Sequence, residues 1–347
     1  MNVRDFDFDL PSELIAQEPP PQRGGSRLLF LHRATGAIDD ASIGALPDLL
    51  DSGDLLVINN TRVFPARLLG RRVPSGGVVE CLLVARLDAD RWEALVHPGQ
   101  KLKPGARVVF EGASTLHGEI LERRFYGRRV VRLWTEDGSA VDGVVDAIGH
   151  MPLPPYIKRA DRDDDRERYQ TIFARSRGSI AAPTAGLHFT PELLDRCTAR
   201  GVEVAEITLH VGYGTFQPVR VDRVEDHRLE PERYEVTPAA ANAISGALRD
   251  GRRIVAVGTT TTRTLEAAIR QHEGRIVPAS GEADLFIYPG FQFRVVSGLL
   301  TNFHLPRSSL LMLVAALAGR EQVLNAYEHA VAERYRFYSY GDAMLVL

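Results

Sequence analysis

Hydrophobic positions come in short runs, separated by polar turns, over much of the first half of the chain. Between residues 54 and 149, glycine, proline and charged residues bound the apolar runs at intervals of about 8 to 12 residues. Short strands at this spacing are typical of a β-barrel or a β-sandwich, so we expect a small all-β unit here. The runs are DLLVIN, ARLLGRRV, VVECLLVARL, RWEALVH, ARVVFEG, GEILERR and RRVVRLW.

From residue 178 onward, helical and strand patterns alternate. Two of the predicted helices follow a threonine, begin at a proline and stop before a glycine, which are the usual start and stop residues. This alternation is typical of an α/β layer domain with a largely buried sheet. The predicted helices cover 191–200, 238–250 and 321–335, and the predicted strands cover 252–258, 284–288 and the C-terminal residues.

Some segments carry irregular patterns. The apolar residues of 202–211 change parity near Ala205, which predicts a β-bulge. The prolines of 151–159 predict a stiff extended crossing, and the charged run 161–170 predicts an exposed connector or a flexible loop. A Pro-Gly turn between the aromatic residues of 286–293 predicts a hairpin.

Composition narrows the class of protein. A chain of 347 residues exceeds the usual limit of a single core, so we expect two domains. Cys81 and Cys197 match no metal or redox spacing, which indicates a reducing cytosol and no structural zinc. The N-terminus has no basic-then-apolar leader, and the longest apolar run, 310–318, is far short of the roughly 20 residues that span a bilayer. We therefore expect a cytoplasmic protein with no membrane partner.

The net charge of -3 argues against nonspecific coating of nucleic acid, which needs many contacts from lysine and arginine to phosphate. A nucleic-acid partner would have to meet a local basic patch. The alternative is that the basic runs are solvated strand edges. The candidate patches are Arg62, Arg67, Arg71 and Arg72; Arg123, Arg124, Arg128, Arg129 and Arg132; and Lys158 with Arg159.

Two glycine-bearing motifs could bind a ligand. In GTTTTRT, the unpaired N–H groups of a helix start could bind a carboxylate or phosphate near Arg263, and the alternative is a threonine N-cap on a buried helix. In LHVGYGTFQPV, the glycines allow close backbone approach and the aromatic residues offer a face for a flat base, or the motif simply closes a strand. Neither a Walker loop nor a dinucleotide fingerprint occurs, so ATP and NAD are not indicated.

Polar residues interrupt two apolar stretches. Asn302, His304 and Arg307 lie between the apolar segments of 299–319, and 181–191 is a small, glycine-bearing loop with a histidine at its exit. A buried polar group without a partner costs roughly 1–3 kcal/mol, so the fold or a ligand must satisfy these groups. Two such loops suggest one pocket.

Histidines are candidates for proton transfer, although a hydrogen-bonded structural role is the alternative for each. His188, His210 and His304 each lie in an unusual loop or at a strand end. None has a partner at metal-ligand spacing, and no serine elbow or cysteine dyad accompanies them. Hydrolases and metalloenzymes are therefore disfavoured.

A set of ordered motifs covers the chain nearly from end to end. The motifs are SRLL, LLVINNTRVFPARL, HPGQKLKPG, GHMPLPPYIKR, RYQTIFA, GSIAAPTAGLHFT, LHVGYGTFQPV, ERYEV, VGTTTTRTLE, ADLFIYPGFQF, LLTNFHLPRSSLLMLVAALAG and YRFYSYGDAML. Together they resemble the S-adenosylmethionine:tRNA ribosyltransferase-isomerase family of queuosine biosynthesis. The resemblance implies a large α/β domain, residues 1–56 and 150–347, interrupted by an inserted small antiparallel β-barrel domain, residues 57–149.

The resemblance also implies a reaction. The ribosyl part of S-adenosylmethionine would move onto the aminomethyl group of a 7-deazaguanine in the tRNA anticodon arm, giving epoxyqueuosine and releasing adenine and methionine. S-adenosylmethionine would be a substrate, and no cofactor is expected. Such chemistry needs a base, a group that stabilises the leaving adenine, and a dry pocket in which the amine attacks unprotonated. We expect a monomer whose partners are S-adenosylmethionine and the anticodon arm.

Site residues are assigned on the matching positions. His188 and His304 are candidate acid and base groups, Asp342 would orient one of them, and Asn302 would bind the ribose or the deazaguanine. The GTTTT turn with Arg263 is the candidate for the methionine carboxylate. The predicted hinge, where tRNA and pocket would meet, is Asn59, Asn60, Thr61 and Arg62. The other candidate substrate-binding residues are Thr184, Gly186, Gly212, Gly214, Thr215, Phe216, Thr259, Thr260 and Arg307, and no metal ligand is expected.

One position departs from the family. Where the family commonly has Met-His, this chain has Leu229 and Glu230. Leucine conserves the volume of methionine, but glutamate in place of histidine changes charge and proton chemistry. Three functions stay open: the tRNA-modifying transferase, which we favour; a related ribosyl transferase with another acceptor; and a catalytically silent RNA-binding module.

Overall fold

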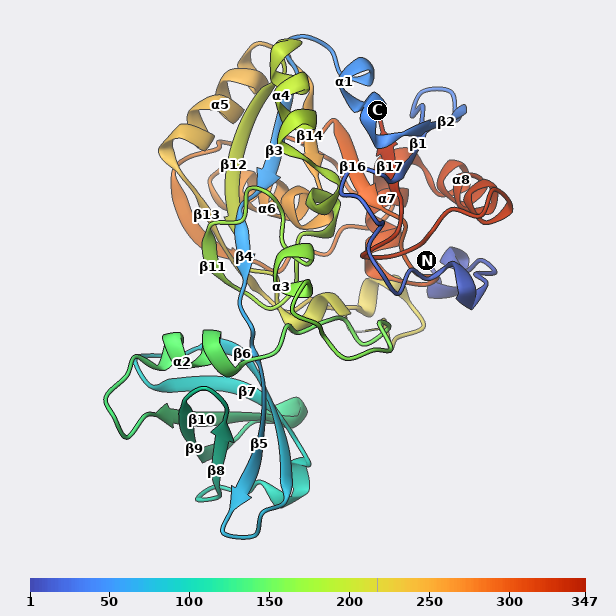
Figure 1. Cartoon of the computed structure of the whole chain (residues 1–347). Coiled ribbons are helices and arrows are strands. Elements are labelled where there is room, and N and C mark those ends of the chain that lie inside the picture. Colours follow the sequence, from blue (N-terminus) through green and yellow to red (C-terminus); the bar gives the residue numbers. More distant parts are fainter. Residues whose placement is uncertain (217) are drawn as a thin grey trace.

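The protein consists of a large α/β domain and a small β-barrel, which form two lobes in the computed structural model (Figure 1). The structure describes residues 1–216 and 218–347. The barrel is inserted into the large domain: the chain enters it after β4 (Thr61–Val63) and returns through β11 (Ser176–Ser179), and these two strands pair in parallel. The predicted fold class is confirmed.

A mixed sheet forms the centre of the large domain. Its middle strands β12, β3, β14 and β16 are parallel neighbours. The run LLVIN of β3 is apolar throughout because a central parallel strand is buried on both faces. The strand order is β15 (Ala279–Ala283), β13 (Glu232–Val236), β12 (Glu203–Leu209), β3 (Leu55–Asn59), β14 (Ile254–Val257), β16 (Gly298–Asn302), β17 (Ala343–Val346), β1 (Arg27–Leu31) and β2 (Ile38–Ser42).

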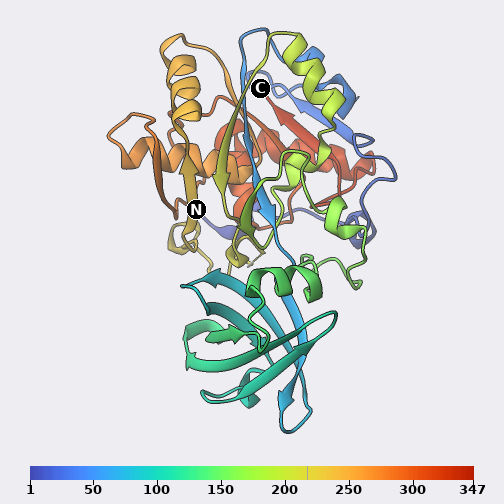
Figure 2. The same ribbon diagram turned by 60° about the vertical axis from the view of Figure 1, so that its left-hand side comes forward.

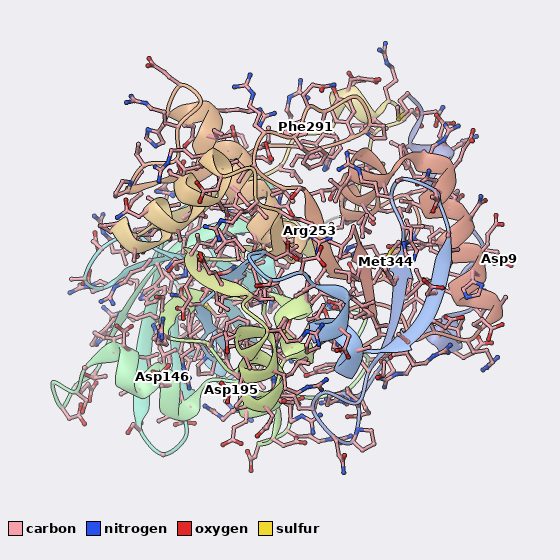
Figure 3. The ribbon with its side chains drawn as sticks, turned by 90° about the horizontal axis from the view of Figure 1, so that it is seen from above. Asp9, Asp146, Asp195, Arg253, Phe291 and Met344 are labelled. Atoms are coloured by element: carbon pink, nitrogen blue, oxygen red, sulfur yellow. The ribbon has the colours of Figure 1, made fainter. Side chains whose placement is uncertain are left out.

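Helices cover both faces of this sheet. Leu55 and Val57 of β3 pack on one face with the longer helices, whereas Leu56 and Ile58 pack on the other. Figure 3 shows the two sides, with Met344 of β17 between the layers. The first face carries α5 (Pro238–Arg249), α6 (Thr259–Gln271), α7 (Ser309–Ala318) and α8 (Arg320–Ala332), and the second carries α1 (Leu46–Leu49) and α4 (Pro191–Ala199).

The predicted helix starts are confirmed. The hydroxyl of Thr190 accepts the N–H of Leu193 at 3.1 Å and begins α4, and the hydroxyl of Thr237 accepts the N–H of Ala240 at 3.2 Å and begins α5. Proline occupies the first helical position in both, where its missing N–H costs no hydrogen bond.

The bulge predicted near Ala205 is absent from the described pairing of β12 with β3. The register runs unbroken from Glu203 opposite Leu55 to Ile207 opposite Asn59. Successive residues of this strand pack against opposite helix layers. Apolar residues therefore occur at both odd and even positions, and no bulge is needed to explain them.

The strand predicted at 284–288 is also wrong. The edge strand β15 lies just before it, in the polar run ASGEA, because pairing with β13 decides the strand there rather than composition. The Pro-Gly turn exists, with the N–H of Phe291 donating to the carbonyl of Tyr288 at 3.1 Å. Its flanking residues form no hairpin in the described structure and pack their aromatic rings on the core instead.

The small domain is a closed antiparallel barrel with its own apolar core. Inward and outward residues alternate along its strands, as the sequence pattern predicted. A short helix, α2 (Val141–Ile148), packs on the barrel and lies between the two lobes (Figure 2). The strands are β5 (Arg67–Val73), β6 (Val78–Arg86), β7 (Arg91–His97), β8 (Arg107–Glu111), β9 (Thr115–Arg123) and β10 (Arg128–Trp134).

The chain leaves the large domain after β3. The boundary predicted between residues 56 and 57 falls inside this strand, which pairs with β12 and β14 in the large sheet. The run DLLVIN therefore belongs to the large domain, although its length and spacing match those of the barrel strands that follow. The barrel itself begins at Arg67.

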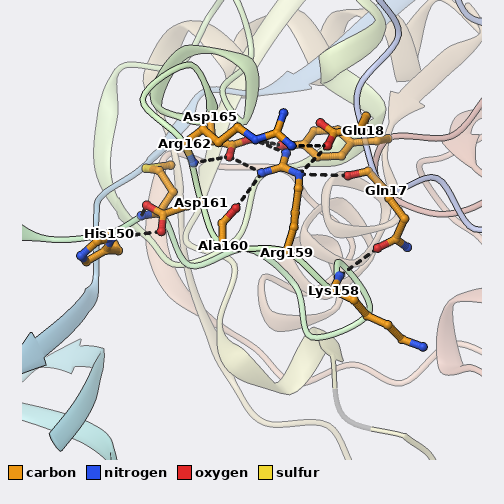
Figure 4. A network of polar contacts seen from close by, with 11 residues as sticks. Gln17, Glu18, His150, Lys158, Arg159, Ala160, Asp161, Arg162 and Asp165 are labelled. Carbon is orange, nitrogen blue, oxygen red and sulfur yellow. Dashed lines mark hydrogen bonds and ion pairs between the residues drawn. The ribbon is translucent and has the colours of Figure 1, made fainter. Parts of the chain in front are cut away.

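The charged run after the prolines is not a plain exposed loop. It contains α3 (Asp165–Arg168), whose Asp165 is buried. Arg159 donates to both oxygens of this carboxylate at 2.6 and 2.8 Å and pairs with Glu18 at 3.0 Å (Figure 4). The hydroxyl of Tyr340 also donates to Asp165 at 3.1 Å. This segment therefore ties the N-terminal segment to the C-terminal loop.

Candidate active site

A cavity lies at the edge of the large sheet where the parallel strands β12, β14 and β16 end. The carboxyl ends of parallel strands are the usual ligand position in open α/β sheets. The cavity has an empty volume of about 520 Å³, part of it continuous with solvent. Its lining residues are Ala181, Ala182, Pro183, Thr184, Ala185, Val211, Thr215, Gly258, Thr259, Thr260, Thr301, Asn302, Phe303, His304, Leu310, Tyr338 and Ser339.

The described residues that line the cavity include no aspartate, glutamate, lysine or arginine. Alanine, threonine and glycine make a surface that is small, mildly polar and uncharged. An isolated charge is costly to bury without a partner. The cavity therefore suits an uncharged part of a ligand.

Helix α6 begins at this cavity. Gly258 is its N-cap, with φ at 93°, a value that glycine adopts without strain, and none of the described side chains caps the first turn. The alternative of a threonine N-cap is thus wrong: Thr261 and Thr262 donate instead to the carbonyls of Val257, the last residue of β14, and of Gly258. The first N–H groups of α6 and the positive end of its dipole stay at the cavity wall.

Arg263 does not reach the cavity. It is buried on α6 and forms an ion pair with Glu232 of β13, which is also buried. The other oxygen of Glu232 accepts the N–H of Gly212 at 2.8 Å and the hydroxyl of Thr215 at 3.1 Å. The methionine carboxylate predicted at Arg263 would therefore compete with a carboxylate already in place.

Asn302 and His188 form a hydrogen-bonded chain behind the cavity. The Asn302 amide nitrogen donates to the carbonyl of Tyr338 at 3.0 Å and lies 3.2 Å from Nε2 of His188. The Nδ1 atom of His188 lies 2.9 Å from the hydroxyl of Ser26. His188 faces a smaller hollow that also includes Arg23, and it is linked to the cavity through its contact with Asn302.

His304 lines the cavity directly. Its Nε2 lies 2.9 Å from the hydroxyl of Thr301, and its backbone N–H donates to the hydroxyl of Tyr327 at 3.1 Å. Burial lowers the pKa of His304 to about 3. The imidazole is therefore neutral at physiological pH.

Asp342 does not orient either histidine, contrary to expectation. Its two oxygens accept the backbone N–H groups of Arg27 at 3.0 Å and Arg336 at 2.8 Å. The carboxylate thus holds the C-terminal loop against the start of β1. Its role in the described structure is to shape the loop that lines the cavity.

The predicted hinge residues lie at the neck between the domains, but outside the cavity. Asn59, Asn60 and Thr61 are buried and bind β12 and the residue after it, whereas Arg62 is exposed. Their side chains join the neck to the large sheet. The contacts are Asn59 Nδ2 to Leu209 O at 3.0 Å, Asn60 Nδ2 to Glu206 Oε2 at 3.1 Å, and Thr61 Oγ1 to His210 Nδ1 at 2.8 Å.

The remaining candidates divide between several places. Gly186 is a packing position, since a Cβ atom there would lie 2.7 Å from Thr171 and 2.8 Å from Phe173. Arg307 lies in a depression that adjoins the cavity and pairs with Asp7 at 3.4 Å. The side chain of Phe216 lies outside the described residues. The candidates that line the cavity are Thr184, Thr215, Thr259, Thr260, Asn302 and His304, and those that line the groove beside the barrel are Gly212 and Gly214.

Comparison with known proteins identifies the family. A family model described as "Queuosine biosynthesis protein" matches residues 3–346. The chain belongs to the queuosine biosynthesis protein family. It is 53% identical over 100% of both chains to the S-adenosylmethionine:tRNA ribosyltransferase-isomerases of Desulfitobacterium hafniense and Symbiobacterium thermophilum. The predicted family and the prediction of an enzyme are confirmed.

A solved structure supports the same family. The crystal structure of S-adenosylmethionine tRNA ribosyltransferase from Thermotoga maritima is 39% identical and matches with a TM-score of 0.54, covering 99% of this chain and 100% of that chain.

Within residues 1–216 and 218–347, no cluster of three or more His, Cys, Asp or Glu side chains could hold a metal ion. Over the same residues, no helix has the length and apolar character needed to cross a membrane.

Sequence reasoning missed Tyr338 and Ser339, which this queuosine biosynthesis protein presents at the cavity. Tyr338 has φ at 76°, a conformation that is uncommon outside glycine and often found at functional sites. Its ring packs edge-on against Tyr156, with ring centroids 3.8 Å apart. The motif YSYGD contained both residues, but an aspartate is the more obvious chemical group in it.

Glu230, the departure from the family pattern, lies in the groove between the barrel and the large domain. It pairs with Arg128 of β10, which also donates to Glu93 at 2.5 Å. Glu230 therefore contacts the barrel and does not line the cavity. Its charge is balanced by an arginine rather than offered to the reacting groups.

The predicted basic patches are largely engaged within the protein, an arrangement that favours the alternative of strand edges. Arg67 pairs with Glu80 at 2.7 Å, and Arg132 pairs with Asp90 at 2.8 Å. Arg129 is buried and donates to backbone carbonyls.

Proposed function

We propose that this chain transfers and isomerises the ribosyl part of S-adenosylmethionine onto 7-aminomethyl-7-deazaguanine in tRNA, giving epoxyqueuosine in tRNA and releasing adenine and methionine. The names of the relatives that are 53% identical over the full length support the substrates. The observation that carries the proposal is the uncharged cavity at the carboxyl ends of the parallel strands. It lies at the usual ligand position of open α/β sheets.

The uncharged lining supports a proposal for where each part of the substrate binds. The ribose and adenine of S-adenosylmethionine would lie in the cavity, because neither carries a charge that needs an ionic partner. The methionine carboxylate would lie toward the adjoining depression, where the side chain of Arg307 is 57% exposed. Arg263 is excluded from this role by its ion pair with Glu232.

His304 is the candidate proton acceptor, because its imidazole lines the cavity and is neutral at rest. Burial lowers the pKa of this imidazole to about 3, so His304 is a weak base and needs a donor that is itself acidic. The sulfonium makes the adjacent ribose carbon acidic, and His304 would take that proton. The same uncharged surroundings would keep the attacking amine unprotonated, because burial without an anionic partner lowers the pKa of an amine.

The start of α6 would stabilise the leaving adenine. The uncapped N–H groups after Gly258 and the positive end of the helix dipole favour electron-rich atoms. Electrostatic stabilisation of this kind costs no reorganisation during the reaction, since the groups are already in position.

The test is mass spectrometry of nucleosides from tRNA that carries the aminomethyl-deazaguanine, after incubation with the protein and S-adenosylmethionine, with free adenine assayed alongside. Equal amounts of epoxyqueuosine and adenine are expected. Adenine without the tRNA product would indicate a different acceptor. The absence of both products would overturn the proposal.

A variant tests the role of His304. His304→Gln should fold and lower kcat by about 100-fold or more, the range for loss of a general base. The matched control is His32→Gln, which removes an exposed histidine paired with Asp39 at 2.6 Å and should keep full activity. Turnover of His304→Gln at the level of the control would remove His304 from the mechanism.

A further inference from the structure

The amide of Asn302 is held in one orientation. Asn302 is 2% exposed, and its nitrogen donates to the carbonyl of Tyr338 and to Nε2 of His188. Rotating the amide by half a turn would place its oxygen against that carbonyl, where neither atom can donate. The oxygen Oδ1 therefore stays on the other side, and it accepts no hydrogen bond in the described structure.

The same contacts fix the tautomer of His188. Since Nε2 accepts a hydrogen bond from Asn302, the proton lies on Nδ1 and is donated to the hydroxyl of Ser26. Both ring nitrogens are thus occupied within the fold. His188 is 4% exposed and does not line the cavity, so no substrate atom in the cavity can reach its nitrogens without displacing Asn302.

Another unpaired group lines the same cavity. The hydroxyl of Thr260, in the first turn of α6, is buried and has no hydrogen-bond partner among the described residues. An unpaired buried polar group costs roughly 1–3 kcal/mol. Asn302 Oδ1 and this hydroxyl are therefore suited to a ligand that supplies neutral hydrogen-bonding groups.

We infer that His188 is a positioning residue, not the proton-transfer group: it holds the Asn302 amide so that Oδ1 accepts a hydrogen bond from a neutral O–H or N–H of the S-adenosyl substrate. The ribose hydroxyls and the adenine amine supply such donors. An ammonium group is excluded as the donor, because no carboxylate is present among the described residues that line the cavity. The identity of the ligand rests on the proposed function, whereas the orientation of the amide rests on the contacts alone.

Binding of S-adenosylhomocysteine, which lacks the reactive sulfonium, tests the contact at Oδ1. Calorimetry would compare the wild type with Asn302→Ala, using S-adenosylhomocysteine and its 2′-deoxy, 3′-deoxy and N6,N6-dimethyl analogues. One analogue should bind the wild type about tenfold more weakly and show no further loss in the variant, because the donor and its acceptor act as a pair. If every analogue loses the same factor in both proteins, Oδ1 contacts none of these donors and the inference is overturned.

Two variants of His188 separate positioning from proton transfer. His188→Gln keeps an acceptor near Nε2 and should stay within about threefold of the wild type in both Kd for S-adenosylhomocysteine and kcat. His188→Leu has a similar size without an acceptor and should raise that Kd about tenfold. Normal binding by His188→Gln with kcat reduced about 100-fold or more would show proton transfer and overturn the inference. A wild-type Kd for His188→Leu would also overturn it.

If His188→Leu does not fold, Ser26→Ala takes its place. This variant keeps the ring but removes the acceptor of Nδ1–H, so a Kd raised about sixfold is expected, roughly the 1 kcal/mol of one hydrogen bond. A wild-type Kd for Ser26→Ala would contradict the inference. A wild type that binds S-adenosylhomocysteine normally but modifies no tRNA would overturn the proposed function and leave the positioning role standing.

Discussion

The cavity in the large domain and the groove beside the barrel hold their polar groups in opposite ways. In the groove, arginines and carboxylates meet each other: Arg128 pairs with Glu93 and Glu230, and Arg86 pairs with Asp142 at 2.6 Å. In the cavity, charged side chains are absent from the described lining, and Asn302 Oδ1 and Thr260 Oγ1 have no hydrogen-bond partner. The groove also contains two such atoms, Trp92 Nε1 and Asp142 Oδ1, but they lie among charged side chains.

This difference distinguishes the cavity, where we expect the reaction, from the groove, which supports the structure. Unpaired buried groups are costly unless a ligand satisfies them, so in an uncharged cavity they fit a substrate that supplies neutral hydrogen-bonding groups. Paired charges in the groove need no ligand, and the Arg128–Glu230 pair joins the barrel to the large domain. The reaction is therefore expected in the large domain, with the barrel as an accessory that carries none of the reacting groups.

The largest effect should come from breaking the buried ion pair beside the cavity. Arg263→Met leaves Glu232 as a buried charge without its cation, since the two side chains are only 5% and 4% exposed. Loss of one partner of such a pair costs about 3–5 kcal/mol of unfolding free energy. Urea denaturation measures this loss.

The double variant Arg263→Met, Glu232→Gln serves as the control for that experiment. It removes both charges, so it should recover part of the stability lost in the single variant. A single variant as stable as the wild type would show that the pair is not buried as described, and the contrast with the groove would disappear.

Acid should weaken the large domain through its buried histidines. Burial, with smaller contributions from Arg336 and Arg23, lowers the pKa of His188 from 6.5 to about 4. The unfolded chain then binds a proton that the folded protein does not, so stability is fully present above pH 6.5 and falls as the pH drops toward 4. His188 alone contributes about 3 kcal/mol to this fall.

Urea denaturation at several values between pH 7 and pH 4 checks that contribution. The free energy of unfolding of His188→Gln should fall less steeply than that of the wild type over this window, because the variant lacks the titrating group. Parallel curves for the two proteins would contradict a buried, neutral His188. His304, whose pKa burial lowers to about 3, acts in the same direction in both proteins.

The smallest effect is expected in the groove. Glu230→Gln removes one charge from a pair whose side chains are 18% and 35% exposed, and such pairs contribute about 0–1 kcal/mol. Stability and the Kd for S-adenosylhomocysteine should both stay near the wild-type values. A tenfold loss of S-adenosylhomocysteine binding in this variant would give the groove a direct part in the site.

Local signals made much of the fold predictable. The threonine and proline that start α4 and α5 contact residues within the next four positions. The alternation of inward and outward residues is a property of each barrel strand, so both signals could be found in the sequence. The β15 edge and the position of β3 depend instead on which strands pair, and that is decided by residues far apart in the chain.

The site was predictable only in part for the same reason. Motifs identified Asn302, His304 and the GTTTT turn, which the structure brings to one cavity. The partners of Arg263 and Asp342 lie on other elements, so sequence alone assigned these two charged residues to the substrate when the fold already uses them. A charged residue in a motif is thus weak evidence for a contact with the substrate, because the fold can already pair it.

A crystal structure of this chain with S-adenosylhomocysteine tests the central claim most directly. The account predicts the ribose and adenine in the cavity, with a donor of the ligand within hydrogen-bond distance of Asn302 Oδ1 and His188 still bonded to Ser26 and Asn302. A ligand bound in the groove against Arg128, or one whose atoms contact the nitrogens of His188, would contradict it.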